Sequence, residues 1–258
     1  MTIAFGILAT DGIVLAADTE ETSGYAGGLK TDSQKILTGI CAGEKQTAVA
    51  ISGAGMANYI DSISPKMLSA ITDATQNPSL TYDTLQDAIE SELADFYGKH
   101  VIPFANFPDH ERPDFCLLIG VEHGSHSGIW STDKTTVCRC MPFGAVGVGS
   151  AYAKILLAGL VKKMDLMQAG IVAAYVAFEV KRTIEGCGRD TDIVLVRRDG
   201  TTSYIYPQDI LKMEQLFQEY ESIDRKLFHY ALGTEPAGDI DQILSRITSL
   251  RSELSARA

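Results

Sequence analysis

The stretch of sequence that decides the fold is Met1-Thr2-Ile3-Ala4-Phe5-Gly6, followed by Leu15-Ala16-Ala17-Asp18-Thr19 and by Ser33-Gln34-Lys35-Ile36-Leu37. Large apolar residues alternate with small ones in the first segment, and Asp11-Gly12 marks a turn before the second, which predicts a hairpin of two buried strands. An aspartate ends this hairpin, and a lysine precedes the next apolar strand. An unpaired charge beside an apolar strand is costly, which argues against both residues being simple surface charges.

Thr2 becomes the first residue if Met1 is removed, which its small side chain should permit. A terminal threonine carries a hydroxyl nucleophile and a free α-amine, whose intrinsic pKa of about 7.7–8.0 leaves a useful neutral fraction at pH 7. The amine can then accept the hydroxyl proton as a general base. Threonine is also a common second residue, so Thr2 alone would indicate little.

Taken together, these segments resemble the proteasome β-type subunits, which are N-terminal-nucleophile hydrolases. In that family a terminal threonine is followed by an aspartate and a lysine, and Thr2, Asp18 and Lys35 match, with one residue inserted between the last two. Thr22 fits the family's substrate-contacting threonine. Ile51-Ser52-Gly53-Ala54-Gly55 fits the turn whose glycine N–H forms the oxyanion hole. The resemblance covers roughly residues 2–206.

The resemblance implies a role for each matching residue. Lys35 would lie beside the Thr2 hydroxyl and favour the alkoxide, and Asp18 would hold the lysine; the alternative is a surface ion pair of about 0–1 kcal/mol. Gly53 would donate its N–H to the oxyanion, although it can equally be a plain turn glycine. Ile51 and Gly55 would line the pocket for the residue before the scissile bond, which favours small or apolar side chains.

Two segments depart from the family pattern. The family has Gly-Ser-Gly before its third helix, where this chain has Gly147-Val148-Gly149, unless Ser150 replaces the serine through a local shift. The family also has an aspartate and a serine after the fourth helix. Here Glu185 or Asp190 would replace the acid and Cys187 the hydroxyl, and the register is ambiguous.

Composition limits the possible partners and compartments. The 258 residues carry a net charge of −11, which argues against a nucleic-acid or anionic-membrane partner. Without a long apolar run or a cationic leader, we expect a cytoplasmic protein. The five cysteines lack metal-type spacing, so we expect reduced thiols and no metal, and attack by a threonine hydroxyl would need no cofactor.

Periodicity predicts strands, two helices, strands, two helices and strands along residues 1–206. The segment 19–34 reads as a loop, and Pro65 is expected to interrupt the first helical region. An α+β four-layer α-β-β-α sandwich satisfies this order and is the fold that the resemblance implies. Residues 207–258 read as a C-terminal helical extension with an amphipathic stripe, which packs on its own subunit, a neighbouring subunit or another partner.

From the resemblance we expect a divergent bacterial proteasome homologue: a threonine-type endopeptidase in stacked homo-oligomeric rings, acting on peptides or unfolded proteins. A regulatory ATPase stays an open question. Two alternatives remain. One is a non-catalytic ring-forming scaffold, which Val148 would suit. The other is an N-terminal-nucleophile amidase acting on a small molecule.

Overall fold

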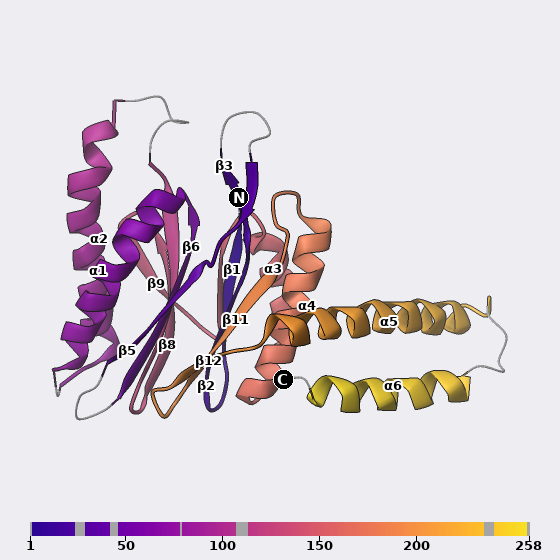
Figure 1. The fold of residues 1–258 in the computed structure, drawn as a ribbon. Helices are drawn as coiled ribbons and strands as arrows, with labels where there is room; N and C mark the ends of the chain where they lie inside the picture. Colours follow the sequence, from indigo (N-terminus) through magenta and orange to yellow (C-terminus); the bar gives the residue numbers. More distant parts are fainter. Residues whose placement is uncertain are drawn as a thin grey trace.

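The computed structural model describes residues 2–23, 29–41, 46–77, 79–106, 113–234 and 240–256. Within these residues, two five-stranded antiparallel sheets stack face to face between two layers of helices (Figure 1). This is an α+β four-layer α-β-β-α sandwich, so the fold predicted from the sequence is confirmed. No helix of the described residues is both long and apolar enough to cross a membrane.

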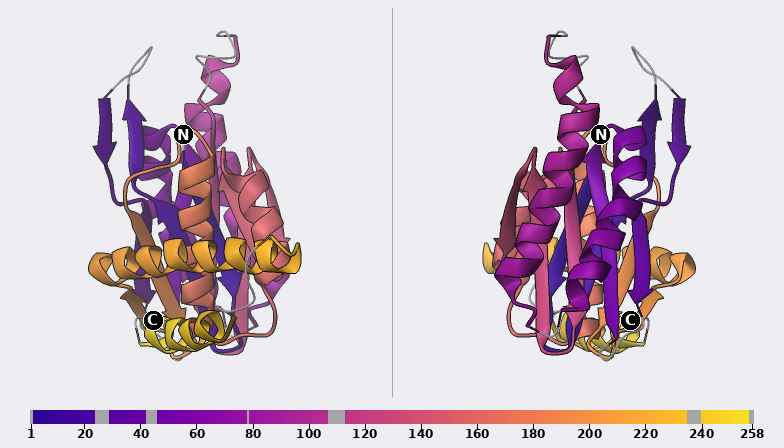
Figure 2. Two further views of the ribbon diagram at one scale, coloured as in Figure 1. Left: turned by 90° about the vertical axis from the view of Figure 1, so that its right-hand side faces the viewer. Right: turned by 90° about the vertical axis from the view of Figure 1, so that its left-hand side faces the viewer.

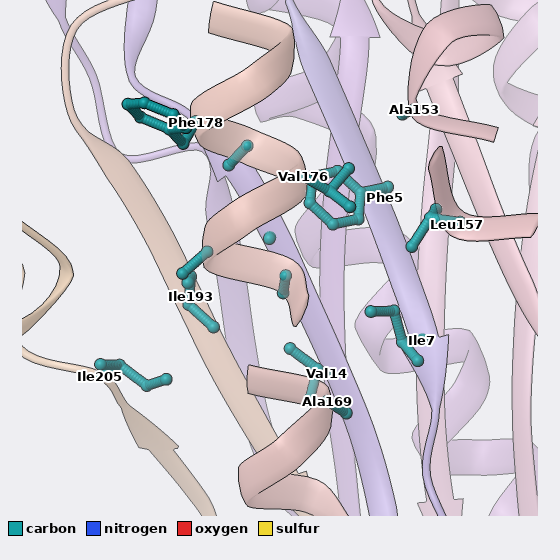
Figure 3. Close-up of a cluster of buried hydrophobic side chains, with 14 of the residues drawn as sticks. Phe5, Ile7, Val14, Ala153, Leu157, Ala169, Val176, Phe178, Ile193 and Ile205 are labelled. Carbon is teal, nitrogen blue, oxygen red and sulfur yellow. The ribbon is translucent and has the colours of Figure 1, made fainter. Parts of the chain in front are cut away.

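The first sheet carries the N-terminus. Its strands, in spatial order, are β10 (Phe143–Gly147), β1 (Ile3–Leu8), β2 (Gly12–Asp18), β11 (Thr191–Arg197) and β12 (Thr202–Tyr204). The alternation noted in the sequence sorts the side chains of β1 between its two faces. Ile3, Phe5 and Ile7 pack in the core beneath the helices, where Figure 3 shows Phe5 and Ile7, and Ala4 belongs to the core between the two sheets.

The second sheet supplies the other wall of the sandwich. Its strands, in spatial order, are β5 (Ile36–Cys41), β6 (Thr47–Gly55), β7 (Phe115–His123), β8 (His126–Asp133) and β9 (Thr136–Cys140). The core between the sheets is rich in alanine, including Ala17, Ala48 and Ala50. These small side chains let the two sheets approach closely while still excluding water.

The outer layers are helical. Helices α1 (Ala57–Thr75) and α2 (Tyr82–His100) cover the second sheet, and a short 3-10 turn, η1 (Ile102–Phe104), follows them. Helices α3 (Ser150–Leu160) and α4 (Leu166–Thr183) cover the first sheet. Both α2 and α4 begin with a capping box, which satisfies N–H groups that a helix start leaves unpaired.

Two further helices follow the last strand, α5 (Pro207–Ala231) and α6 (Ile240–Ser255). Helix α5 crosses α4, and α6 lies beside α5 (Figures 1 and 2). Phe217 of α5 packs against Tyr175 and Phe178 of α4, with ring centroids 5.3 and 5.9 Å away. The first half of α5 therefore belongs to the hydrophobic core of the same chain.

Two sequence-based expectations were wrong. The segment 19–34, predicted as a loop, contains a paired ribbon of β3 (Glu20–Ser23) and β4 (Leu29–Asp32). Its polar composition concealed the strands, because the segment lacks the alternating apolar residues from which a strand is predicted. Pro65 does not interrupt α1, which runs through it. The proline removes one backbone hydrogen bond on the exposed side of the helix, while Ile63, Met67 and Ile71 anchor the buried side.

Candidate active site

Thr2 lies immediately before β1, where the first sheet places it beside the end of β2. Its side chain is buried, and its Oγ1 donates a hydrogen bond of 3.1 Å to Oδ1 of Asp18. The same carboxylate oxygen accepts the backbone N–H of Ile3 at 3.0 Å. The hairpin predicted from the sequence therefore brings the hydroxyl and the carboxylate together across 16 residues of chain.

Lys35 reaches this pair from the start of the second sheet. Its Nζ lies 3.0 Å from Oδ1 of Asp18 and also donates to Oγ1 of Thr2 and to the carbonyl of Glu20. The lysine side chain is 11% exposed and the aspartate 0%. The ion pair is thus buried rather than superficial, and its attraction is stronger at the lower effective dielectric of the interior.

The second oxygen of the Asp18 carboxylate is held by a residue that the sequence analysis missed. Oδ2 accepts the backbone N–H of Gly188 at 3.0 Å. The pairing of Thr191 on β11 with Asp18 on β2 brings this loop to the site. In this loop the sequence points to Glu185, Cys187 and Asp190, whereas a backbone donor such as Gly188 leaves no residue-type signal.

A cleft of about 750 Å³ opens beside Thr2. Five of the residues predicted from the sequence line it, namely Thr2, Lys35, Ile51, Gly53 and Gly55. A Cβ on Gly53 would lie 2.9 Å from Cγ2 of Ile60, and Gly55 has φ +118° and lies close to the carbonyl of Asp114. Both positions therefore require glycine, which fixes the turn from β6 into α1.

For Thr22, the expected substrate contact, the structure describes the backbone alone. Its backbone belongs to β3, opposite Lys30 of β4, but its side chain lies outside the described part of the structure. The role that the resemblance implies for it stays a prediction.

The residues proposed to replace the family's supporting groups lie in different surroundings. Val148 is 49% exposed, Ser150 begins α3 without lining the cleft, and Glu185 is exposed. Cys187 is buried and accepts the backbone N–H of Gly149. Burial, helped by the negative charge of Asp18 and opposed by Lys35, raises the pKa of its thiol to about 12. Asp190 contributes backbone hydrogen bonds to Thr19.

Further polar groups at the site were not found from the sequence. Glu20, Glu21 and Asp61 line the cleft, as does Tyr204, whose hydroxyl lies 3.0 Å from Nε2 of Gln34 and 3.3 Å from the carbonyl of Ile36. Tyr204 thereby contacts both neighbours of Lys35 in the chain, Gln34 and Ile36. Among the described residues, no group of three or more His, Cys, Asp or Glu side chains is arranged to hold a metal ion.

Asp192 of β11 supports the same segment from beneath. Its carboxylate accepts the backbone N–H of Lys35. Burial raises the pKa of Asp192, while that hydrogen bond and the lysine charge lower it. The lysine is thus fixed by its backbone as well as by its ammonium group.

No family model and no curated protein matches the sequence. Among solved structures, the chain superimposes on Anbu from Hyphomicrobium sp. strain MC1, a Gly-1 mutant, with a TM-score of 0.69 and 15% identity. The match covers 90% of this chain and 99% of that chain. The fold is similar to that of Anbu. It is therefore the proteasome-like N-terminal-nucleophile hydrolase fold.

Two other Anbu structures agree. Anbu from Yersinia bercovieri, described as an ancestral beta-subunit, has a TM-score of 0.66 and 12% identity, over 91% of this chain and 98% of its own. The helical assembly of the Anbu complex from Pseudomonas aeruginosa has a TM-score of 0.66 and 14% identity, and the match covers 91% of this chain and 97% of that chain. Residues 1–206 are four-fifths of this chain, so these matches extend into the C-terminal helices.

Proposed function

We propose that this protein is a threonine-type endopeptidase subunit whose nucleophile is Thr2, exposed by removal of Met1. The observation that carries the proposal is the contact of the Thr2 hydroxyl with both Lys35 and Asp18 beside a cleft of about 750 Å³. A buried lysine next to a hydroxyl stabilises the alkoxide that forms during attack. A purely structural ion pair would not need a threonine hydroxyl in contact with both of its partners and an open cleft beside it.

In the proposed reaction, the neutral terminal amine accepts the Thr2 hydroxyl proton as the oxygen attacks the carbonyl carbon of a peptide bond. The N–H of Gly53 donates to the oxyanion of the tetrahedral intermediate, and Lys35 stabilises negative charge on the attacking oxygen. The amine returns the proton to the leaving nitrogen, which leaves an ester on Thr2. Water then attacks the ester with the same amine as base, releasing the carboxylate and restoring the threonine.

We further propose that the chain assembles into rings or a related homo-oligomer that encloses these sites, with peptides or unfolded proteins as substrates. The fold shared with Anbu supports this, because the Pseudomonas aeruginosa Anbu complex is described as a helical assembly. Residues 1–206 would form the hydrolase domain and residues 207–258 its helical extension.

One observation favours a second candidate, a non-catalytic ring-forming scaffold. The family's serine near the amine has no counterpart among the cleft-lining residues, since Val148 is exposed and Ser150 does not line the cleft. The terminal amine would then lack a group that orients it. The test below separates this scaffold from a peptidase.

The test is the intact mass of the purified protein before and after incubation with a threonine-selective epoxyketone. We expect loss of Met1 and one covalent adduct, which peptide mapping assigns to Thr2. Thr2→Ala is the matched control and should lose both the adduct and peptide turnover while keeping the particle mass. A free Thr2 that forms no adduct with any such probe would favour the scaffold, and equal turnover by Thr2→Ala would refute the proposal.

A further inference from the structure

The cleft beside Thr2 combines an apolar surface with acidic side chains. Ile51, Ile60 and Leu37 supply apolar lining, and Ile51 is almost fully buried beneath the cleft. Glu21 on β3 and Asp61 on α1 add carboxylates from two separate elements. Glu21 directly follows Glu20, whose backbone carbonyl accepts a hydrogen bond from Lys35, and it lines the same cleft as Lys35 and Thr2.

The nearby cationic side chains of Lys35 and Arg189 are already paired with other carboxylates. Among the described residues that line the cleft, Lys35 is the only lysine or arginine, and its ammonium binds Asp18 and Thr2. Arg189, which does not line the cleft, pairs with Asp32 at 2.8 Å. The described lining therefore presents more negative than positive charge to a bound peptide.

This inference rests on the proposed peptidase function and names its substrate class. We propose that the cleft selects peptides with lysine or arginine at the residue before the scissile bond. Such side chains have an apolar stem and a cationic head. The stem would lie along Ile51 and Ile60, and the head would pair with the carboxylates of Glu21 and Asp61.

Two physical effects discriminate against other side chains. An acidic side chain would place like charges together in the cleft, and a leucine side chain would gain the apolar contacts alone, without the attraction to the two carboxylates. The chain's net charge of −11 adds a longer-range attraction for cationic peptides, which should weaken as salt screens it. Ile51 alone favours small or apolar side chains at this position, and the preference for cationic ones depends on Glu21 and Asp61.

The experiment compares three peptide epoxyketones that differ only in having arginine, leucine or glutamate next to the reactive group. Each is incubated with the full-length protein whose Thr2 is free by mass, and the second-order rate of adduct formation on Thr2 is measured. We expect arginine to exceed leucine by roughly ten-fold or more, and glutamate to be slowest. Preference for leucine or glutamate would overturn this inference while leaving the nucleophile established.

Variants test which side chains are responsible. Glu21→Gln and Asp61→Asn should each reduce the ratio of arginine to leucine rates, and the double variant should reduce it most. Asp87→Asn on α2 changes net charge equally but does not line the cleft, so it should keep the ratio. An unchanged ratio in the double variant would overturn the inference. No adduct with any of the three probes would instead overturn the proposed function as well.

Discussion

Asp18 shows how one buried side chain organises the site. Its carboxylate accepts hydrogen bonds from Thr2, Ile3 and Lys35 on one oxygen and from Gly188 on the other. A buried carboxylate without such donors would be strongly unfavourable. The four donors come from three separate parts of the chain, so the carboxylate ties β1, β5 and the loop before β11 to one point.

Cys187 lies where the resemblance would place a hydroxyl, and its surroundings predict a poor nucleophile. Burial raises the pKa of its thiol to about 12, so it holds little thiolate at pH 8. With iodoacetamide at pH 8, we expect the exposed Cys138 to be alkylated and Cys187 to stay unmodified until the protein is denatured. Peptide mass mapping of native and denatured samples measures this. Equal modification of both cysteines in the native protein would show the expectation to be wrong.

At the scale of the elements, strand β7 carries a buried acid, Glu122, opposite Ala48 of β6. Ser127 of β8 donates to its Oε1, while Oε2 is without a hydrogen-bond partner among the described residues. Burial raises the pKa of Glu122 to about 7, although Ser127 and Arg198 lower it. The folded protein therefore holds this proton at a pH where the unfolded chain, with a pKa near 4.5, has released it.

This pKa difference makes the free energy of unfolding depend on pH. The stabilising contribution is complete below about pH 4.5 and is lost as the pH rises to about 7, because the unfolded chain ionises first. Glu122→Gln keeps a neutral side chain at every pH. The free energy of unfolding of the variant minus that of the natural protein should therefore increase as the pH is raised from 5 to 8. We expect this increase to be on the order of 1–3 kcal/mol.

Urea denaturation at both pH values measures the difference. Asp87→Asn is the matched control, since it removes one negative charge at an exposed position of α2 without changing a buried side chain. A constant difference between the Glu122→Gln variant and the natural protein would mean that Glu122 ionises normally in the folded state.

At the scale of the whole molecule, helix α6 of the C-terminal extension packs on the rest of the chain. On α6, Leu250 is buried and Leu254 packs against the core beneath α4. Nη2 of Arg246 also lies 2.6 Å from Glu219 of α5. Deleting residues 233–258 should therefore lower Tm by roughly 3–12 °C, mainly through lost burial of Leu250.

Scanning calorimetry measures Tm, and analytical ultracentrifugation of the same samples measures particle mass. Arg246→Gln in the full chain is the control for the partly exposed ion pair, which should contribute less than about 1 kcal/mol. An unchanged Tm after deletion would contradict packing of α6 on its own chain. If the extension also crosses between subunits, the deletion should reduce the particle mass, and an unchanged mass would reject that role.

Some of the site could be predicted from local sequence because its residues stand beside strong strand signals. Thr2, Asp18 and Lys35 each adjoin an apolar strand, and Gly53 and Gly55 stand at the turn from a strand into a helix. Glu21 and Asp61 gave no such signal, since acidic residues in a polar segment or on an exposed helix face are common. The polar β3–β4 ribbon was missed for the same reason.

The sequence by itself determined which segments form the buried strands and the main helices, and it determined the charge of the chain. These depend on periodicity and composition, which are local properties. Only the tertiary structure decided which strands are neighbours, and so which loop reaches Asp18 and which carboxylates line the cleft. Contacts such as that between Gly188 and Asp18 join residues 170 positions apart through backbone atoms that every residue carries. No pattern along the chain distinguishes them until β2 and β11 pair within the first sheet.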